Sequence, residues 1–84
     1  MPPQPQTTGL LTQVLIADKY GPRLGTDQLA AVLGITRGAV LNQISDGRFG
    51  IPTYVDGGKR WADYRDVAAY IDNCRAQALQ QRGH

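Results

Sequence analysis

Apolar residues recur at helical spacing in two neighbouring stretches between Leu24 and Ile44. The apolar positions are Leu29, Ala30, Val32 and Leu33 in the first stretch, and Val40, Leu41 and Ile44 in the second. Because residues three and four apart share one face of a helix, each stretch predicts a short helix with a buried side. Gly34 follows the first stretch, at a position where a left-handed backbone favours glycine. The pattern therefore predicts two helices that meet at a tight glycine turn.

Residues at the starts and at the crossing of these two helices support the same interpretation. Thr26 and Thr36 stand where a hydroxyl can accept a hydrogen bond from a first-turn N–H, and Asp27 suits the positive end of the first helix dipole. The small Ala30 lets the helices cross closely, and Ile35 is expected to fill the corner. These features are typical of a helix-turn-helix. They also fit two core helices with a glycine corner, which many all-helical domains contain.

The second predicted helix, residues 36–45, has a polar face without an acidic residue. This face consists of Thr36, Arg37, Gly38, Asn42 and Ser45. Arginine and asparagine can make paired hydrogen bonds to the edges of guanine and adenine. Gly38 removes a side chain where the backbone could lie close to DNA. Since an ordinary solvated helix is expected to carry acidic residues too, this face favours contact with DNA.

Two segments precede the helix pair. Residues 1–8 (MPPQPQTT) have almost nothing apolar to bury, so we expect a disordered leader. From Gly9 to Tyr20 apolar residues again follow helical spacing, and Gly21-Pro22 ends the pattern. Its apolar positions are Leu10, Leu11, Val14 and Leu15. We expect this helix, residues 10–20, to pack on the back of the helix pair. The alternatives are an extended conformation near residues 14–17 and a face for self-association.

A β-hairpin is predicted over residues 51–62. Its first strand alternates at Ile51, Thr53 and Val55, Asp56-Gly57-Gly58 reverses the chain, and Lys59-Arg60-Trp61 begins the return. Asp-Gly between β-prone runs is a strong hairpin signal, and Pro52 is expected at the start or edge of its strand. Two glycines followed by two cations suit a wing that follows a phosphate backbone or enters a minor groove. The alternative is a hairpin that only covers the core; Tyr54 and Trp61 are interpreted chiefly as supports for the core and the wing.

A closing helix is predicted over residues 63–79 (DYRDVAAYIDNCRAQAL). Asp63 is expected to cap it. Its apolar stripe consists of Val67, Ala68, Tyr70, Ile71 and Cys74. We expect Cys74 on the buried or half-buried side, as a small hydrophobe rather than a nucleophile or ligand. Residues 81–84 are expected to fray, which leaves residues 9–80 as a single domain.

Length and charge agree with a small DNA-binding domain without requiring one. The 84-residue chain has a formal net charge of +2, and its seven arginines and two lysines favour planar, paired phosphate and base contacts over point charges. Arg23, just before the helix pair, could reach a phosphate. The single cysteine excludes an intramolecular disulfide. No apolar run reaches the length of a membrane span and no signal peptide is visible, so a cytoplasmic location without membrane partners is expected.

Residues for catalysis, metal binding or cofactor binding are not recognisable in the sequence. Paired carboxylates, a Ser-His-Asp set, a phosphate-cradling glycine loop and metal-ligand spacing are all missing, and the only histidine is His84. We therefore expect no enzyme activity, no cofactor and no metal.

Three motifs, which follow one another along the chain, support a resemblance to a known protein family. They are Asp46-Gly47-Arg48-Phe49, Gly57-Gly58-Lys59-Arg60 and Asp66-Val67-Ala68-Ala69-Tyr70-Ile71. With the helix pair before them, they resemble the small winged helix-turn-helix domain of phage excisionases and related MerR-like prophage regulators. The layout is also similar to the pyocin activator family. The resemblance covers about residues 24–75; Gln43, where the family usually has an apolar residue, and the longer approach Gly50-Ile51-Pro52 depart from it.

The resemblance implies a mainly α fold with a β-hairpin wing, and binding of double-stranded DNA. Helix 36–45 would lie in the major groove and the wing beside it. The residues implied in DNA contact are Thr36, Arg37, Gly38, Leu41, Asn42, Ser45, Lys59 and Arg60. The leading hypothesis is a sequence-specific transcription regulator of a prophage or mobile element. An excisionase that bends attachment-site DNA for an integrase, or a protein-interaction module using helix 10–20, are the alternatives. The chain itself, RNA polymerase or an integrase would be further partners.

Overall fold

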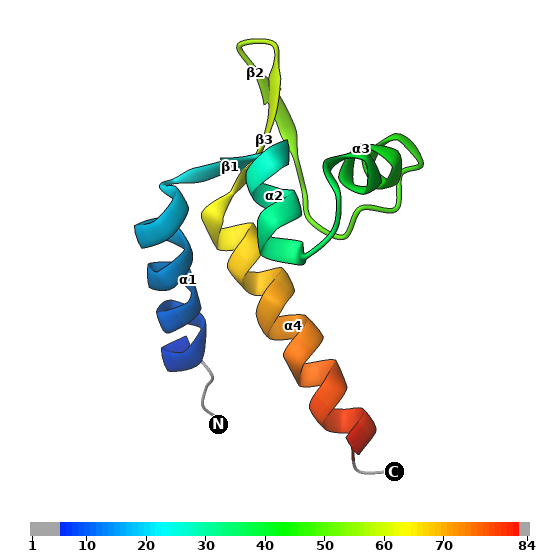
Figure 1. Ribbon diagram of the computed structural model, residues 1–84. Coiled ribbons are helices and arrows are strands. Elements are labelled where there is room, and N and C mark those ends of the chain that lie inside the picture. The colour runs from blue at the N-terminus through cyan, green and yellow to red at the C-terminus, as the bar shows by residue number, and fades with distance from the viewer. Residues whose placement is uncertain (1–5, 83–84) are drawn as a thin grey trace.

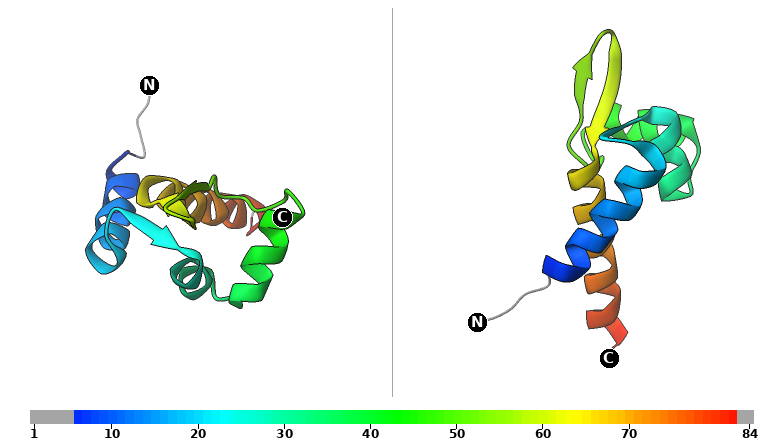
Figure 2. Two further views of the ribbon diagram at one scale, coloured as in Figure 1. Left: turned by 90° about the horizontal axis from the view of Figure 1, so that it is seen from above. Right: turned by 90° about the vertical axis from the view of Figure 1, so that its left-hand side faces the viewer.

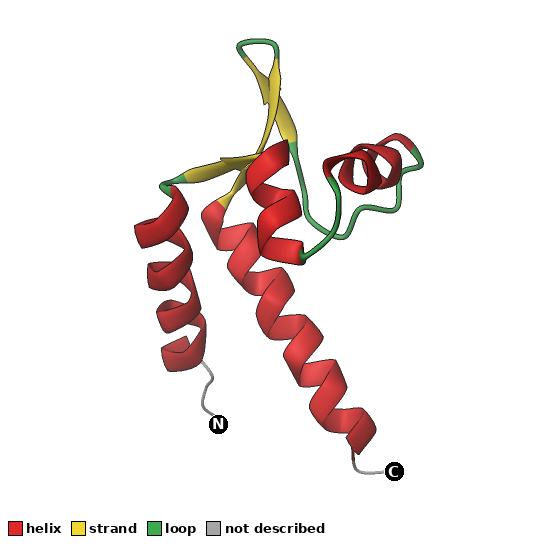
Figure 3. Ribbon diagram, in the orientation of Figure 1, coloured by secondary structure: helices red, strands yellow, loops and turns green. Residues whose placement is uncertain are grey.

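The computed structural model describes residues 6–82 of the chain, and the side chains of residues 9–80. Its elements are α1 (Gln6–Tyr20), β1 (Arg23–Gly25), α2 (Thr26–Leu33), α3 (Arg37–Ser45), β2 (Tyr54–Asp56), β3 (Lys59–Asp63) and α4 (Tyr64–Arg82) (Figure 1). The described chain is mainly helical, with one small antiparallel sheet (Figure 3). The expected combination of helices with a β-hairpin is confirmed.

The three strands form one sheet in which β3 lies between β1 and β2. β2 and β3 are the predicted hairpin, and Gly57 and Gly58 at its tip have φ angles of 63° and 80°. A two-residue type I′ turn requires positive φ at both central positions, which explains the two glycines. The sequence pattern does not predict β1, because three residues are too few to show an alternation. Its pairing with β3 sets Leu24 opposite Ala62.

The core lies between the sheet, the α2–α3 pair and the first half of α4. Its largest fully buried side chains are Leu24, Leu29, Val40 and Val67. Leu33 and Ile44 are half-buried and pack against these residues from the two crossing helices. The helical spacing of apolar residues therefore identifies most of the inner faces of α2, α3 and α4. Leu41 is the exception on α3, since 40% of it remains exposed.

The ends of α2 and α3 follow the predicted capping in part. The Thr36 hydroxyl accepts a hydrogen bond of 3.0 Å from the Ala39 N–H, and Gly34 has the left-handed conformation, with φ of 71°. The cap predicted at Thr26 is wrong, because α2 already begins there. Gly25 stands at the cap position, and its N–H donates to the Gln28 side-chain oxygen over 2.9 Å. The pairing of β1 up to Gly25 brings the chain into the helix one residue earlier than predicted.

The approach to the hairpin packs into the core instead of extending β2. Ile51 is only 2% exposed and β2 begins three residues later, at Tyr54, so the predicted strand start at Ile51 is wrong. A β-carbon on Gly50 would lie 2.6 Å from Cε1 of Tyr70, closer than side chains pack. The missing side chain at Gly50 therefore leaves room for the Tyr70 ring. The buried side chain of Ile51 anchors the loop that leads into the hairpin.

Helix α1 lies antiparallel beside α4 rather than against the α2–α3 pair (Figures 1 and 2). The hydroxyl of Thr12 donates a hydrogen bond of 2.8 Å to the Asp72 carboxylate, and Ile16 packs against the core. The helix is continuous through residues 14–17 and begins at Gln6, inside the predicted leader. Residues 1–5 of that leader lie outside the described residues. The expected packing on the back of the helix pair is therefore wrong.

Helix α4 begins at the predicted cap and continues beyond its predicted end. The Asp63 carboxylate accepts a hydrogen bond of 2.8 Å from the Arg65 N–H, and the Arg65 guanidinium beside it lowers the pKa of Asp63. The helix reaches Arg82, so two residues of the predicted frayed tail are helical and the last two lie outside the described part. Cys74 is exposed, which contradicts its predicted burial. A hydrogen bond with Cys74 raises the pKa of the Tyr70 hydroxyl.

Replacement of Leu29 by alanine is expected to lower the free energy of unfolding by about 2–5 kcal/mol, because the fully buried side chain would leave a cavity. Urea unfolding followed by circular dichroism measures the change. Leu79→Ala removes the same atoms from a side chain that is 48% exposed and is expected to change stability by less than about 0.5 kcal/mol. Equal losses for both variants would contradict the assigned core.

Candidate nucleic-acid interface

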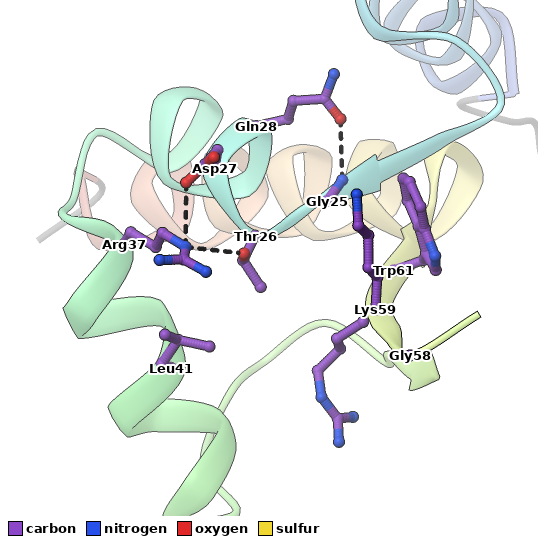
Figure 4. Close-up of a pocket in the computed structure, with 10 residues that line it drawn as sticks. Gly25, Thr26, Asp27, Gln28, Arg37, Leu41, Gly58, Lys59 and Trp61 are labelled. Carbon is purple, nitrogen blue, oxygen red and sulfur yellow. Dashed lines mark hydrogen bonds and ion pairs between the residues drawn. The ribbon is translucent and has the colours of Figure 1, made fainter. Parts of the chain in front are cut away.

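A cleft of about 590 Å³ separates the first half of α3 from the β2–β3 hairpin, with the start of α2 at its floor (Figure 4). Its lining residues are Gly25, Thr26, Asp27, Gln28, Arg37, Leu41, Gly58, Lys59, Arg60 and Trp61. Four of them belong to the eight residues implied in DNA contact: Arg37, Leu41, Lys59 and Arg60. The fold thus brings cations that are more than twenty positions apart in the sequence to the two sides of one cleft.

On the α3 side, Arg37 is held in place by the beginning of α2. Its Nε lies 3.1 Å from the Asp27 carboxylate and donates to the Thr26 hydroxyl over 3.3 Å. Neither contact uses the two terminal nitrogens of the guanidinium, and the side chain is 62% exposed. The arginine therefore has a preferred direction while the edge that could bind a base or a phosphate stays accessible. Leu41 lies one turn further along α3 and presents an exposed apolar surface beside it.

On the hairpin side, the two cations that are adjacent in the sequence differ in their contacts. The Arg60 guanidinium donates a hydrogen bond of 2.9 Å to the Thr53 hydroxyl, which ties it to the chain just before β2. Lys59 is exposed and, among the contacts of the described residues, has no ion-pair partner. An ammonium group without an ion-pair partner among the described residues and a guanidinium group tied to Thr53 thus both line the hairpin side of the cleft.

Arg23 braces the hairpin instead of projecting from the surface. Its Nη1 donates to the Asp56 carboxylate over 2.8 Å, and its guanidinium lies 4.0 Å from the centre of the Trp61 ring. The hydrogen bond with Asp56 raises the pKa of Arg23. The Trp61 indole N–H in turn donates to the Asp56 carbonyl oxygen over 3.2 Å. These contacts bind β1 to both strands of the hairpin, whereas the sequence suggested a phosphate contact for Arg23.

The remaining four predicted contact residues are exposed on α3 but do not line the cleft. They are Thr36, Gly38, Asn42 and Ser45. Since the Thr36 hydroxyl already accepts the capping hydrogen bond, its role inside the chain is structural. A β-carbon on Gly38 would approach no atom closer than 3.9 Å, so packing within the chain does not require glycine there. The predicted polar face is therefore exposed, and only its first turn joins the cleft.

Sequence reasoning missed Asp27, Gln28 and Trp61 as parts of this site. Asp27 was assigned to the helix dipole alone, and its contact with Arg37 depends on the crossing of α2 and α3. The place of Trp61 in the cleft depends on the position of β1, a strand too short to show a sequence pattern. No signal in the sequence connects these residues with the cleft.

The hairpin brace gives a prediction about local stability. Arg23→Ala is expected to speed amide hydrogen exchange in β2 and in the paired part of β3, because it removes both the Asp56 ion pair and the Trp61 contact. Arg48→Ala, which removes an exposed ion pair with Asp46 of 3.3 Å, is the matched control. Unchanged hairpin exchange in Arg23→Ala would contradict the brace.

Other kinds of site find no support in the described residues. Between residues 6 and 82 no three His, Cys, Asp or Glu side chains gather as a metal site would require. None of the helices in this part of the chain combines the length and hydropathy needed to cross a membrane. Comparisons with protein-family models, with curated proteins and with solved structures found no match.

Proposed function

We propose that this protein binds double-stranded DNA sequence-specifically as a winged helix-turn-helix regulator. In this proposal α2 and α3 are the helix-turn-helix, α3 enters the major groove, and the β2–β3 hairpin is a wing on the neighbouring backbone or minor groove. The observation that carries the proposal is the cleft with Arg37 on one side and Lys59 and Arg60 on the other. An arrangement of this kind is what the resemblance to excisionases and MerR-like prophage regulators implies.

The charges around the cleft support an anionic ligand. Its two nearest carboxylates, Asp27 and Asp56, each lie within 3.1 Å of an arginine nitrogen and are neutralised by it. Lys59 and Arg60 therefore contribute positive charge that no neighbouring carboxylate cancels, and phosphate contacts provide much of the affinity of DNA-binding proteins. Asn42, Ser45 and the open edge of Arg37 supply groups able to read bases.

The direct test is selection of bound sites from random duplex DNA, followed by affinity measurements on the selected site and on random duplex. A tighter selected site, by a factor of at least about 1,000, is expected of a sequence-specific protein. Equal affinity for both DNAs would contradict specificity, and no binding at moderate salt would contradict the proposal. Footprinting on native DNA would separate the two roles: a promoter operator indicates a transcription regulator, and repeated sites in an attachment region indicate an excisionase.

Alanine at Arg37 or at Asn42 is expected to relax sequence preference at one or two base pairs, because each side chain can form paired hydrogen bonds to a base edge. The loss of discrimination is about 1–3 kcal/mol per contact. Binding to the selected site should weaken more than binding to random duplex in a fluorescence anisotropy titration. Arg75→Ala and Asn73→Ala make the same changes at exposed positions of α4 and should leave both affinities unchanged. Equal losses on both DNAs would assign Arg37 and Asn42 to phosphates only.

Removal of both wing cations, Lys59→Ala with Arg60→Ala, is expected to weaken binding to every DNA. Each lost phosphate contact makes the slope of log affinity against log salt shallower by about 0.9, so a decrease of roughly one to two is expected. Sequence preference from Asn42 should persist. The double variant Lys19→Ala with Arg75→Ala removes the same charge from other exposed positions and serves as control. A slope that stays the same as in the wild type would show that the hairpin does not touch DNA.

A further inference from the structure

The outer face of α1 carries the largest group of exposed aliphatic side chains in the described part of the chain. Leu10, Leu11, Val14 and Leu15 are each 59–61% exposed. They lie on the side of the helix opposite Thr12 and Ile16, which face α4 and the core. We call these four residues the α1 stripe. Exposed leucines that gather on one helix face, rather than scattering singly, indicate an interaction surface.

The α1 stripe is uncharged, and so is the rest of α1 up to Ala17. From Gln6 to Ala17 the helix contains no acidic or basic residue, and the first charges, Asp18 and Lys19, cancel. A lipid surface is therefore disfavoured, because helices that lie on membranes carry basic residues on their polar face. An acidic or basic protein partner would find no complementary charge.

We propose that the α1 stripe pairs with the α1 stripe of a second copy in an antiparallel, two-fold arrangement. In such a pair each surface meets an identical surface, so eight aliphatic side chains would be buried together. The register that superposes the stripes sets Leu11 against Val14 of the second copy, and Leu10 against its Leu15. The pairing does not depend on DNA binding, since α1 lies at the opposite end of the molecule from α3 (Figure 2).

The charges at the helix ends favour the antiparallel direction. In the same register Asp18 lies beside the first turn of the second α1, near its residue 7. That turn contains no acidic residue of its own, and a carboxylate near a helix N-terminus is stabilising. A parallel pair would instead bring the two Asp18 carboxylates together. The stripe covers six residues, or about 9 Å of helix. A standard interface buries roughly 800 Å² per partner, which is more than so short a stripe can bury. A weak dimer is therefore expected.

Sedimentation equilibrium of the wild-type protein from about 10 µM to about 1 mM tests the pairing in the absence of DNA. The average mass is expected to rise toward that of a dimer. Leu11→Gln with Val14→Gln should lower the association constant at least about tenfold, while circular dichroism shows an unchanged fold, because both side chains are exposed. Leu79→Gln, an exposed leucine on α4, is the control and should associate as the wild type does.

The register has its own test. Leu11→Asp and Val14→Lys variants should each associate more weakly than the wild type, and their equimolar mixture more tightly than either alone. A wild-type protein that stays monomeric at 1 mM, or a double glutamine variant that associates normally, overturns the proposal. Species larger than a dimer would show that the stripe binds a different surface of the next copy. Binding to vesicles of anionic lipid without self-association would identify a membrane surface as the occupant instead.

Discussion

The antiparallel pairing of β1 with β3 is the contact on which the arrangement of this protein depends. It places Leu24 opposite Ala62, and both are completely buried. Because β1 leads directly into α2, and β3 is the return strand of the hairpin and leads into α4, one short ladder sets the hairpin and both helices relative to each other. The Arg23 brace adds a second attachment on the exposed side. The cleft between α3 and the hairpin follows from this geometry.

Arginines in this protein divide into those that hold the structure and those that remain available to a ligand. Arg23 is committed to Asp56 and Trp61, and Arg65 to the capping carboxylate of Asp63. Arg37 is intermediate, since Asp27 orients it through Nε alone. The two ion pairs near the cleft cancel Asp27 and Asp56 together with the charges of Arg37 and Arg23, which leaves Lys59 and Arg60 as the net charge there. The local balance of +2 at the proposed DNA-binding face therefore equals the whole formal charge of the chain.

Helix α1 shows how a small domain divides apolar residues between core and surface. Thr12 joins it to α4 by a hydrogen bond, and Ile16 and Tyr20 pack against the core, while the leucines that make its sequence look amphipathic are exposed. A pattern of apolar residues defines a face, but it does not say whether that face meets the same chain or another molecule. The assignment of this helix as packing on the helix pair was wrong for that reason.

The sequence by itself determined the elements whose signals are local. Helical spacing identifies Leu29 and Val40 as core. The two glycines of the hairpin tip identify its turn, because the positive φ angles of this turn favour glycine. Only the tertiary structure decided where the remaining residues act. β1, the place of Ile51 in the core and the contact of Asp27 with Arg37 each depend on segments distant along the chain. The local sequence pattern does not predict such contacts, because burial and ion pairing depend on which distant residues the fold places next to each other.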